Sequence, residues 1–257
     1  MKLSLLLTSL VTFTMATAYM DVNPPASTLA ERSHTGELED CFTNAECMQK
    51  GLPLRAPRRR GRNEARAPMV SPIPVTGRLQ VFDQSGASMG FVSASRNAYG
   101  EYGVSTSNPL FVTLNRATSG SQDVMTVRSA VGYSNLAAVA GFANTNNNFG
   151  TGSFNYAYLS GSNSQTPVGS RPVSLPNSFS DASAFSTQRE LESAIFRYNP
   201  VTMAVTPHWI NADGSAPATF FVFVPSDGGF LALTGDVASF RSTFGTGSQV
   251  TMKLVIS

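Results

Sequence analysis

The chain has 257 residues, of which 42% are hydrophobic and only 13% are charged, and its formal net charge is +2. The apolar share is sufficient for a packed core, while so small a net charge excludes the strong field with which nucleic-acid-binding and membrane-binding proteins attract their partners. Two cysteines and two histidines exclude a disulfide-dense scaffold, a cysteine-based zinc site and a multi-histidine metal centre, so no cofactor is expected.

Residues 1–18 have the features of a secretory signal peptide. Lys2 supplies a positive charge, residues 3–15 are mostly apolar, and Ala16-Thr17-Ala18 is a small-residue cleavage signature. The apolar run is 13 residues long, which is shorter than the ~20 residues that span a bilayer. We therefore expect cleavage before Tyr19, a secreted extracellular protein, and no membrane attachment after cleavage.

Residues 19–73 are predicted to be a disordered tail ahead of a single domain at residues 74–257. Residues 21–49 carry a net charge of −5 and residues 50–66 a net charge of +6. The tail is rich in proline and has no sustained hydrophobic periodicity, which is typical of chain that does not build a core.

Three arginines in the basic half of the tail, Arg59, Arg60 and Arg62, fit the spacing that secretory processing proteases accept. Because nicking occurs where the backbone is exposed and flexible, the tail is a candidate propeptide and the mature chain would begin near Gly61. A solvated linker and a patch that binds polyanions are the alternative explanations of the same arginines.

Both cysteines, Cys41 and Cys47, lie in the tail. In the oxidising environment outside the cell they are predicted to form a disulfide that closes a small local loop, and the alternative is an intermolecular bond from each cysteine. The domain that follows contains no cysteine. Its stability therefore depends on packing and hydrogen bonds, and it has no catalytic thiol.

The domain is predicted to be all-β. From Ile73 onward there are nine basic and nine acidic residues, so charge favours no partner of either sign. Short stretches of alternating apolar residues, rich in β-branched and aromatic side chains, are typical of strands. They occupy residues 78–83, 88–93, 110–115, 124–128, 136–143, 154–159, 194–198, 203–210, 219–224, 230–234 and 249–256. About ten to eleven antiparallel strands with little helix predict a two-sheet sandwich or jelly roll.

Residues 194–235 are expected to form a continuous antiparallel meander. Asp213-Gly214 fits a tight turn, and it is expected to join residues 203–210 to residues 219–224 as a hairpin. Such short connections favour antiparallel pairing between consecutive strands.

Residues 161–187 are rich in serine and proline and lack a strong strand pattern. Because long structureless loops are unusual in a compact domain, we favour a further edge strand around residues 178–185 over an exposed functional loop. Residues 186–193 and 237–244 are each expected to form a single helical turn.

A candidate ligand-binding segment begins with the asparagine-rich residues 144–150 and continues into alternating aromatic residues. Amide groups beside an aromatic strip offer hydrogen bonds and stacking without net charge, which is what neutral sugars require. The predicted binding residues are Asn146, Asn148, Tyr156, Tyr158 and Trp209. The alternative is that the asparagines are turn residues and that the aromatic side chains line a core.

No catalytic or metal-binding residue is predicted. His208 is the only histidine of the domain, and no G-x-S-x-G motif accompanies it. Glu190 and Glu192 would lie about 7 Å apart on one strand face, which fits either glycosidase geometry and so does not discriminate between them. The segment Asn211-x-Asp213-Gly214 lacks the remaining oxygen ligands of a calcium loop.

Several stretches of the sequence carry a resemblance to known proteins. They are Cys41–Cys47 leading into Gly51–Leu54, Arg58–Arg60, Gly77–Val81 with Gly90–Ser93, Asn97–Gly103 and Trp209–Gly214. Their order resembles a group of secreted β-rich proteins of mushroom-forming fungi. The resemblance implies secretion and a β-rich fold, but the group has no assigned activity and no functional residue is carried over from it.

Three hypotheses about function follow. The first is a secreted, non-enzymatic module that binds neutral polysaccharide. The second is a polysaccharide-cleaving enzyme that uses carboxylates of the domain, and the third is a structural or interaction protein of the cell surface. Nucleic acid is not an expected partner, because basic residues do not alternate with aromatic residues in the domain. The sequence does not address the oligomeric state.

Overall fold

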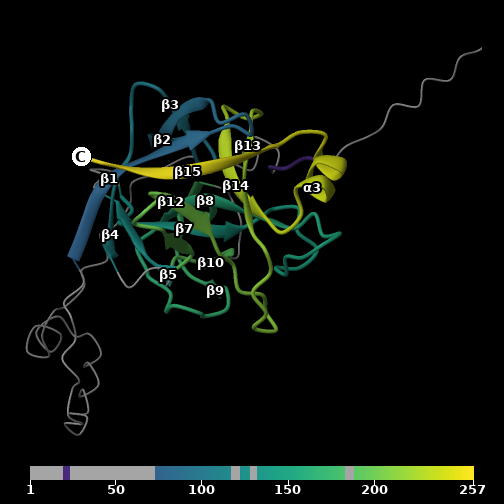
Figure 1. The fold of residues 1–257 in the computed structure, drawn as a ribbon. Helices are drawn as coiled ribbons and strands as arrows, with labels where there is room; N and C mark the ends of the chain where they lie inside the picture. Colours follow the sequence, from purple (N-terminus) through teal and green to yellow (C-terminus); the bar gives the residue numbers. More distant parts are fainter. Residues whose placement is uncertain (1–19, 24–72, 117–121, 128–131, 183–187) are drawn as a thin grey trace, which may run out of the picture.

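The computed structural model describes residues 20–23, 73–116, 122–127, 132–182 and 188–257 (Figure 1). The predicted signal peptide, the disulfide between Cys41 and Cys47 and the processing site at Arg59, Arg60 and Arg62 lie outside the described residues and stay predictions.

The described chain is built mainly of strands. The strands are β1 (Ile73–Phe82), β2 (Ser88–Arg96), β3 (Tyr102–Ser105), β4 (Phe111–Arg116), β5 (Gln122–Asp123), β6 (Met125–Val127), β7 (Asn135–Ala140), β8 (Tyr156–Ser162), β9 (Val173–Ser174), β10 (Glu190–Glu192), β11 (Phe196–Tyr198), β12 (Ala204–Pro207), β13 (Phe220–Val224), β14 (Phe230–Thr234) and β15 (Ser248–Ile256). The helices are α2 (Ser178–Ala182) and α3 (Val237–Phe244), and neither is long and apolar enough to cross a membrane. The all-β prediction is confirmed.

The strands form a closed antiparallel barrel, so the predicted two-sheet sandwich is wrong. Eight strands close the ring in the order β1-β4-β6-β7-β8-β14-β13-β15, and β15 pairs again with β1. The closing pair runs from Gly77 opposite Ile256 to Phe82 opposite Thr251. A period-two pattern fixes which side chains share a face, but it does not specify which strand lies alongside, and closure depends on that choice.

The remaining strands extend the barrel at three places. β2 pairs with β1, and β3 pairs with β2. On β15, β12 pairs with β15, β11 pairs with β12, and β5 pairs with β11. On β7, β10 pairs with β7, and β9 pairs with β10. The expected hairpin of β12 and β13 is not formed, because both strands pair with β15 instead of with each other. They follow one another along the edge of β15 that lies opposite β1. Asp213-Gly214 still lies in a turn, closed by the Gly214 N–H and the Asn211 carbonyl at 2.8 Å.

Two local expectations are wrong and one is confirmed. The edge strand expected at 178–185 is the helix α2, which begins after Asn177 because the Asn177 Oδ1 accepts from the Ser180 N–H at 2.8 Å. Within 186–193, where a helical turn was expected, residues 190–192 form β10. The expected helical turn at 237–244 is α3, capped by Asp236, which accepts from two backbone N–H groups.

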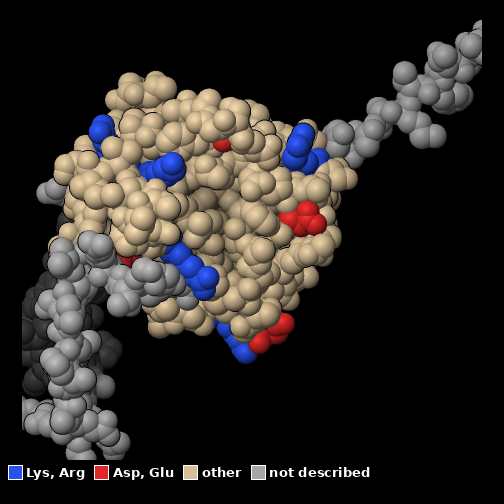
Figure 2. All heavy atoms as spheres, in the orientation of Figure 1, with Lys and Arg blue, Asp and Glu red and all other residues tan. Residues whose placement is uncertain are grey.

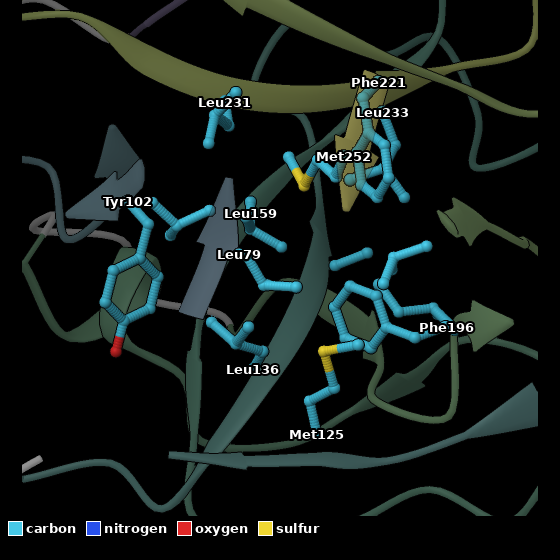
Figure 3. Close-up of a cluster of buried hydrophobic side chains, with 14 of the residues drawn as sticks. Leu79, Tyr102, Met125, Leu136, Leu159, Phe196, Phe221, Leu231, Leu233 and Met252 are labelled. Carbon is cyan, nitrogen blue, oxygen red and sulfur yellow. The ribbon is translucent and has the colours of Figure 1, made fainter. Parts of the chain in front are cut away.

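The barrel interior is filled by alternate residues of each strand. Leu79 of β1, Leu159 of β8, Leu231 of β14 and Met252 of β15 point toward one another (Figure 3) and are almost completely buried. A second apolar cluster lies outside the barrel, where α2 and α3 cover β7, β8, β13 and β14. These strands are therefore buried on both faces, whereas β1 buries mainly one.

A substitution at Gly77 tests the pairing of β1 with β15 that closes the barrel. A Cβ at this position would lie 2.4 Å from the Val255 carbonyl oxygen, so Gly77→Ala is expected to lower the free energy of unfolding by about 1–3 kcal/mol through overpacking. Urea unfolding of the purified chain measures this change, with Ala87→Ser at an exposed turn position as the control. Equal midpoints for the wild type and Gly77→Ala would contradict the closure.

Candidate functional site

The aromatic residues predicted to bind sugar are buried in two different places. Tyr156 and Tyr158 belong to the outer cluster and pack edge to face with ring centroids 5.1 Å apart, whereas Trp209 belongs to the interior cluster. Trp209 stacks on Phe149 with centroids 4.8 Å apart. The three rings are fully buried, so they present no open stacking face, and the core-lining alternative describes them.

The asparagine-rich loop is held by its own hydrogen bonds. The Asn148 Oδ1 accepts from the Ala212 N–H at 2.8 Å, and Asn211 bonds both the N–H and the carbonyl of Phe149. Asn146 is exposed, but its Oδ1 accepts from the Asn148 N–H and from the Asn155 side chain. The loop is therefore a turn held in place by hydrogen bonds, in which most side-chain amide groups bond to other residues of the same chain.

The carboxylates considered for catalysis contact different groups. Glu192 is buried and both of its oxygens accept from the Ile210 N–H, at 3.0 and 3.2 Å. Burial raises the pKa of Glu192 to about 8. Glu190 accepts from the Asn147 side chain. His208 faces Arg197, and burial together with this positive charge lowers the pKa of His208.

A second candidate site lies where residues 20–23, at the start of the predicted tail, pack against the barrel. In Figure 1 this short purple segment lies beside α3. The Met20 N–H donates to the Thr243 carbonyl of α3 at 3.1 Å, and the Val22 side chain is 6% exposed within the outer cluster. The Val22 carbonyl accepts from the hydroxyls of Tyr156 and Tyr158.

Asn23 places its amide between two carboxyl groups. The Asn23 Nδ2 donates to the Glu101 Oε2 at 3.5 Å and to the Asp227 Oδ2 at 3.3 Å. The Asn97 Nδ2 also donates to the Glu101 Oε2, at 2.7 Å. Burial, opposed by these amide hydrogen bonds and reinforced by the negative charge of Asp227, raises the pKa of Glu101 to about 8. The Glu101 carboxyl is therefore mainly neutral at pH 7.

The backbone that positions Glu101 is tightly constrained. Asn97 closes the turn, because its Oδ1 accepts from the N–H groups of Tyr99 and Glu101, both at 3.0 Å. Gly100 has φ +81°, and a Cβ there would lie 2.0 Å from the Ser178 carbonyl oxygen. Only glycine fits this position, which fixes the approach of the turn to α2.

Aromatic rings that are exposed or partly exposed lie on the other side of the barrel, on β1, β2 and β4. The Arg78 guanidinium lies 4.9 Å from the centroid of Phe91 and 5.9 Å from that of Phe111, and the Lys253 Nζ lies 5.5 Å from the centroid of Phe82. Phe111 is 39% exposed. We call Phe82, Phe91, Phe111, Arg78 and Lys253 the aromatic face.

Sequence reasoning missed both sites, although a signal for the aromatic face was present. Phe82, Phe91 and Phe111 alternate with the buried residues Val81, Val92 and Val112, so their phase along the strands indicates the outward face. Residues 20–23 carry no such signal, because four residues are too few to display a period.

Comparisons of the chain with protein-family models, curated proteins and solved structures found no match. The resemblance to secreted fungal proteins therefore stays a prediction. Among the described residues, no three histidine, cysteine, aspartate or glutamate side chains gather in a way that would hold a metal ion.

The two raised carboxyl pKa values predict a pH dependence of stability. Glu101 and Glu192 each have a pKa of about 8 in the folded chain, against the ordinary glutamate value of 4.5. The folded state therefore keeps protons that the unfolded state releases, so the free energy of unfolding is expected to fall as the pH rises from about 4.5 to 8.

Urea unfolding at pH 5, 6.5 and 8 tests this dependence, with Glu192→Gln as the matched variant. Glutamine still accepts from the Ile210 N–H but does not titrate, so the variant is expected to lose less stability between pH 5 and 8 than the wild type. The lowered pKa of His208 acts in the opposite direction but equally in both chains. The same pH slope in both would contradict the assignment to Glu192.

Proposed function

We propose that this protein is a secreted, non-enzymatic module that binds neutral polysaccharide through the aromatic face. The observation that carries the proposal is the set of three outward phenylalanine rings on adjacent strands, each with the charged group of Arg78 or Lys253 within 5.9 Å of its centroid. Sugar rings combine apolar C–H faces with hydroxyl groups. Aromatic rings cover the former, while arginine and lysine supply only donors, which suit hydroxyl oxygens.

The strand register orders these side chains into rows across the sheet. Arg78 of β1 lies opposite Phe111 of β4, and two residues farther along β1, Gln80 lies opposite Phe91 of β2 and Lys253 of β15. Phe82 ends the series. Rows on one face of a strand are about 6.6 Å apart, so the aromatic face extends for roughly 13 Å along β1, long enough for more than one sugar unit.

The charge distribution supports a neutral ligand. Figure 2 shows few charged side chains on the face in view, and these are scattered rather than gathered into a patch of one sign. The domain has equal numbers of acidic and basic residues. Binding would therefore depend on stacking and hydrogen bonds rather than on attraction of a charged polymer.

The alternative of a polysaccharide-cleaving enzyme has less support. Such an enzyme needs carboxyl groups that touch the substrate, but Glu192 is covered by the backbone of Ile210 and Glu101 by Asn23 and Asn97. A structural or interaction protein of the cell surface would need a broad apolar patch, and the aromatic face is instead interrupted by Arg78, Gln80 and Lys253.

A pull-down of the secreted chain with insoluble chitin, β-glucan and cellulose tests the proposal. Replacement of both Phe91 and Phe111 by alanine is expected to weaken retention on the preferred polymer about tenfold, because each stacking ring contributes about 0.5–1.5 kcal/mol. Val201→Ala is the control, since Val201 is an 88% exposed apolar residue that is not one of the five residues of the aromatic face.

Soluble sugar is assayed in the same tubes to separate binding from cleavage. Retention without sugar release, reduced in the double variant and unchanged in the control, would support the module. Released sugar would make the protein an enzyme, and absence of retention on all three polymers would contradict the proposal.

A further inference from the structure

The site that residues 20–23 occupy has the features of a peptide-binding site. Its floor is the outer face of β8 with α3, where Val22 packs against Tyr156, Tyr158, Phe240 and Phe244 in one apolar cluster. The Val22 side chain is almost fully buried, and the segment also makes five hydrogen bonds through the Met20 N–H, the Val22 carbonyl and the Asn23 side chain. Apolar and polar contacts therefore combine within this short segment.

The site recognises one backbone carbonyl with two donors. The hydroxyl oxygens of Tyr156 and Tyr158 lie 3.0 Å apart and accept from the N–H groups of Ala143 and Phe142, at 3.4 and 3.3 Å. Their protons are then directed to the Val22 carbonyl, at 2.5 Å from the Tyr158 oxygen. Burial raises the pKa of both phenols, so both stay protonated donors in neutral solution.

Removal of the segment would leave these donors short of acceptors. One tyrosine could donate to the other across 3.0 Å, but the second would keep a buried hydroxyl proton without its present acceptor. An unsatisfied buried donor costs about 1–3 kcal/mol. The pair of tyrosines is therefore arranged for a carbonyl oxygen supplied from outside the barrel.

The site recognises a carboxamide at the next residue. Asn23 donates to Glu101 and Asp227, and within the described chain the Asn23 Oδ1 and the Glu101 Oε1 are buried without a hydrogen-bond partner. A neutral carboxyl group has one donor and a carboxamide oxygen is an acceptor, so the two unpartnered atoms are complementary. An aspartate in place of Asn23 would instead set a third carboxylate beside two carboxyl groups.

We propose that this is a binding site for an extended peptide in which an apolar residue is followed by asparagine, and that residues 21–23 of the chain are its resident ligand. A chain cut between the segment and the barrel keeps the N-terminal fragment bound without a covalent link. The site lies apart from the aromatic face, so its test does not depend on polysaccharide binding.

The experiment uses the full secreted chain with a site-specific protease sequence in place of residues 58–62. After cleavage, native size-exclusion chromatography followed by mass spectrometry measures how much of the N-terminal fragment co-elutes with the domain. We expect near-stoichiometric retention for the wild-type segment, and separation of the fragment in denaturant.

Substitutions within the segment leave the barrel sequence unchanged, so they keep the test interpretable. Asn23→Asp is nearly isosteric and is expected to lower the affinity of the fragment at least tenfold, and Val22→Asp is expected to abolish retention. Met20→Ala is the matched control, because the Met20 side chain is 48% exposed and only its backbone N–H is used.

A measurement in trans completes the test. A labelled synthetic peptide of residues 19–28 is titrated into the uncut Val22→Asp chain, in which the substituted segment is expected to leave the site free. Fluorescence anisotropy of the labelled peptide reports binding. We expect saturable binding of this peptide and none of a peptide carrying Val22→Asp. Loss of the wild-type fragment after cleavage, or equal retention of all variants, would overturn the proposal.

Discussion

β15 is hydrogen-bonded to neighbouring strands along both edges, with β13 and then β12 along one edge and β1 along the other. Its pairing with β1 turns a long sheet into a closed ring, and Gly77 permits the close approach of the two backbones. Closure fixes which residues of each strand point into the barrel and which point outward. Leu79 and Val81 must point inward, and Arg78, Gln80 and Phe82 must then point outward. The interior core, the aromatic face and the surface that receives residues 20–23 all follow from this ring.

The outer surface of the barrel is covered on one side and only partly covered on the opposite side. In the order β1-β4-β6-β7-β8-β14-β13-β15, β1 and β8 are four strands apart in either direction and so lie opposite each other. On the β8 side, α2, α3 and the N-terminal segment cover large aromatic residues. On the β1 side, Phe91 and Phe111 are covered only in part and contact Arg78. The same residue type therefore serves as core on one side and as surface on the other.

Alternation along the chain predicted the strands well and their neighbours badly. Each of the eleven predicted stretches overlaps an observed strand, and residues 249–256, with the clearest alternation, form β15. However, alternation is a property of one strand, whereas pairing depends on contacts between strands, so the pairing of both β12 and β13 with β15, instead of with each other, was not predictable. Tyr156 and Tyr158 were correctly placed on one strand face, but the sequence does not indicate whether α3 covers that face. Asn23 gave no local signal, since its partners Glu101 and Asp227 are distant in sequence.

The hairpin of β2 and β3 links the two sides. β2 carries Phe91 next to β1, and the turn that follows carries Asn97 and Glu101, which reaches β8 through a bridge to Ser160. Glu101 is neutral because it is buried, and Asn23 is one of the groups that cover it. If Asn23 left, Glu101 would lose one of the groups that cover it, and we expect its carboxyl to ionise more readily, although the negative charge of Asp227 opposes this. Residues 20–23 thus contact the turn of the hairpin that carries part of the aromatic face.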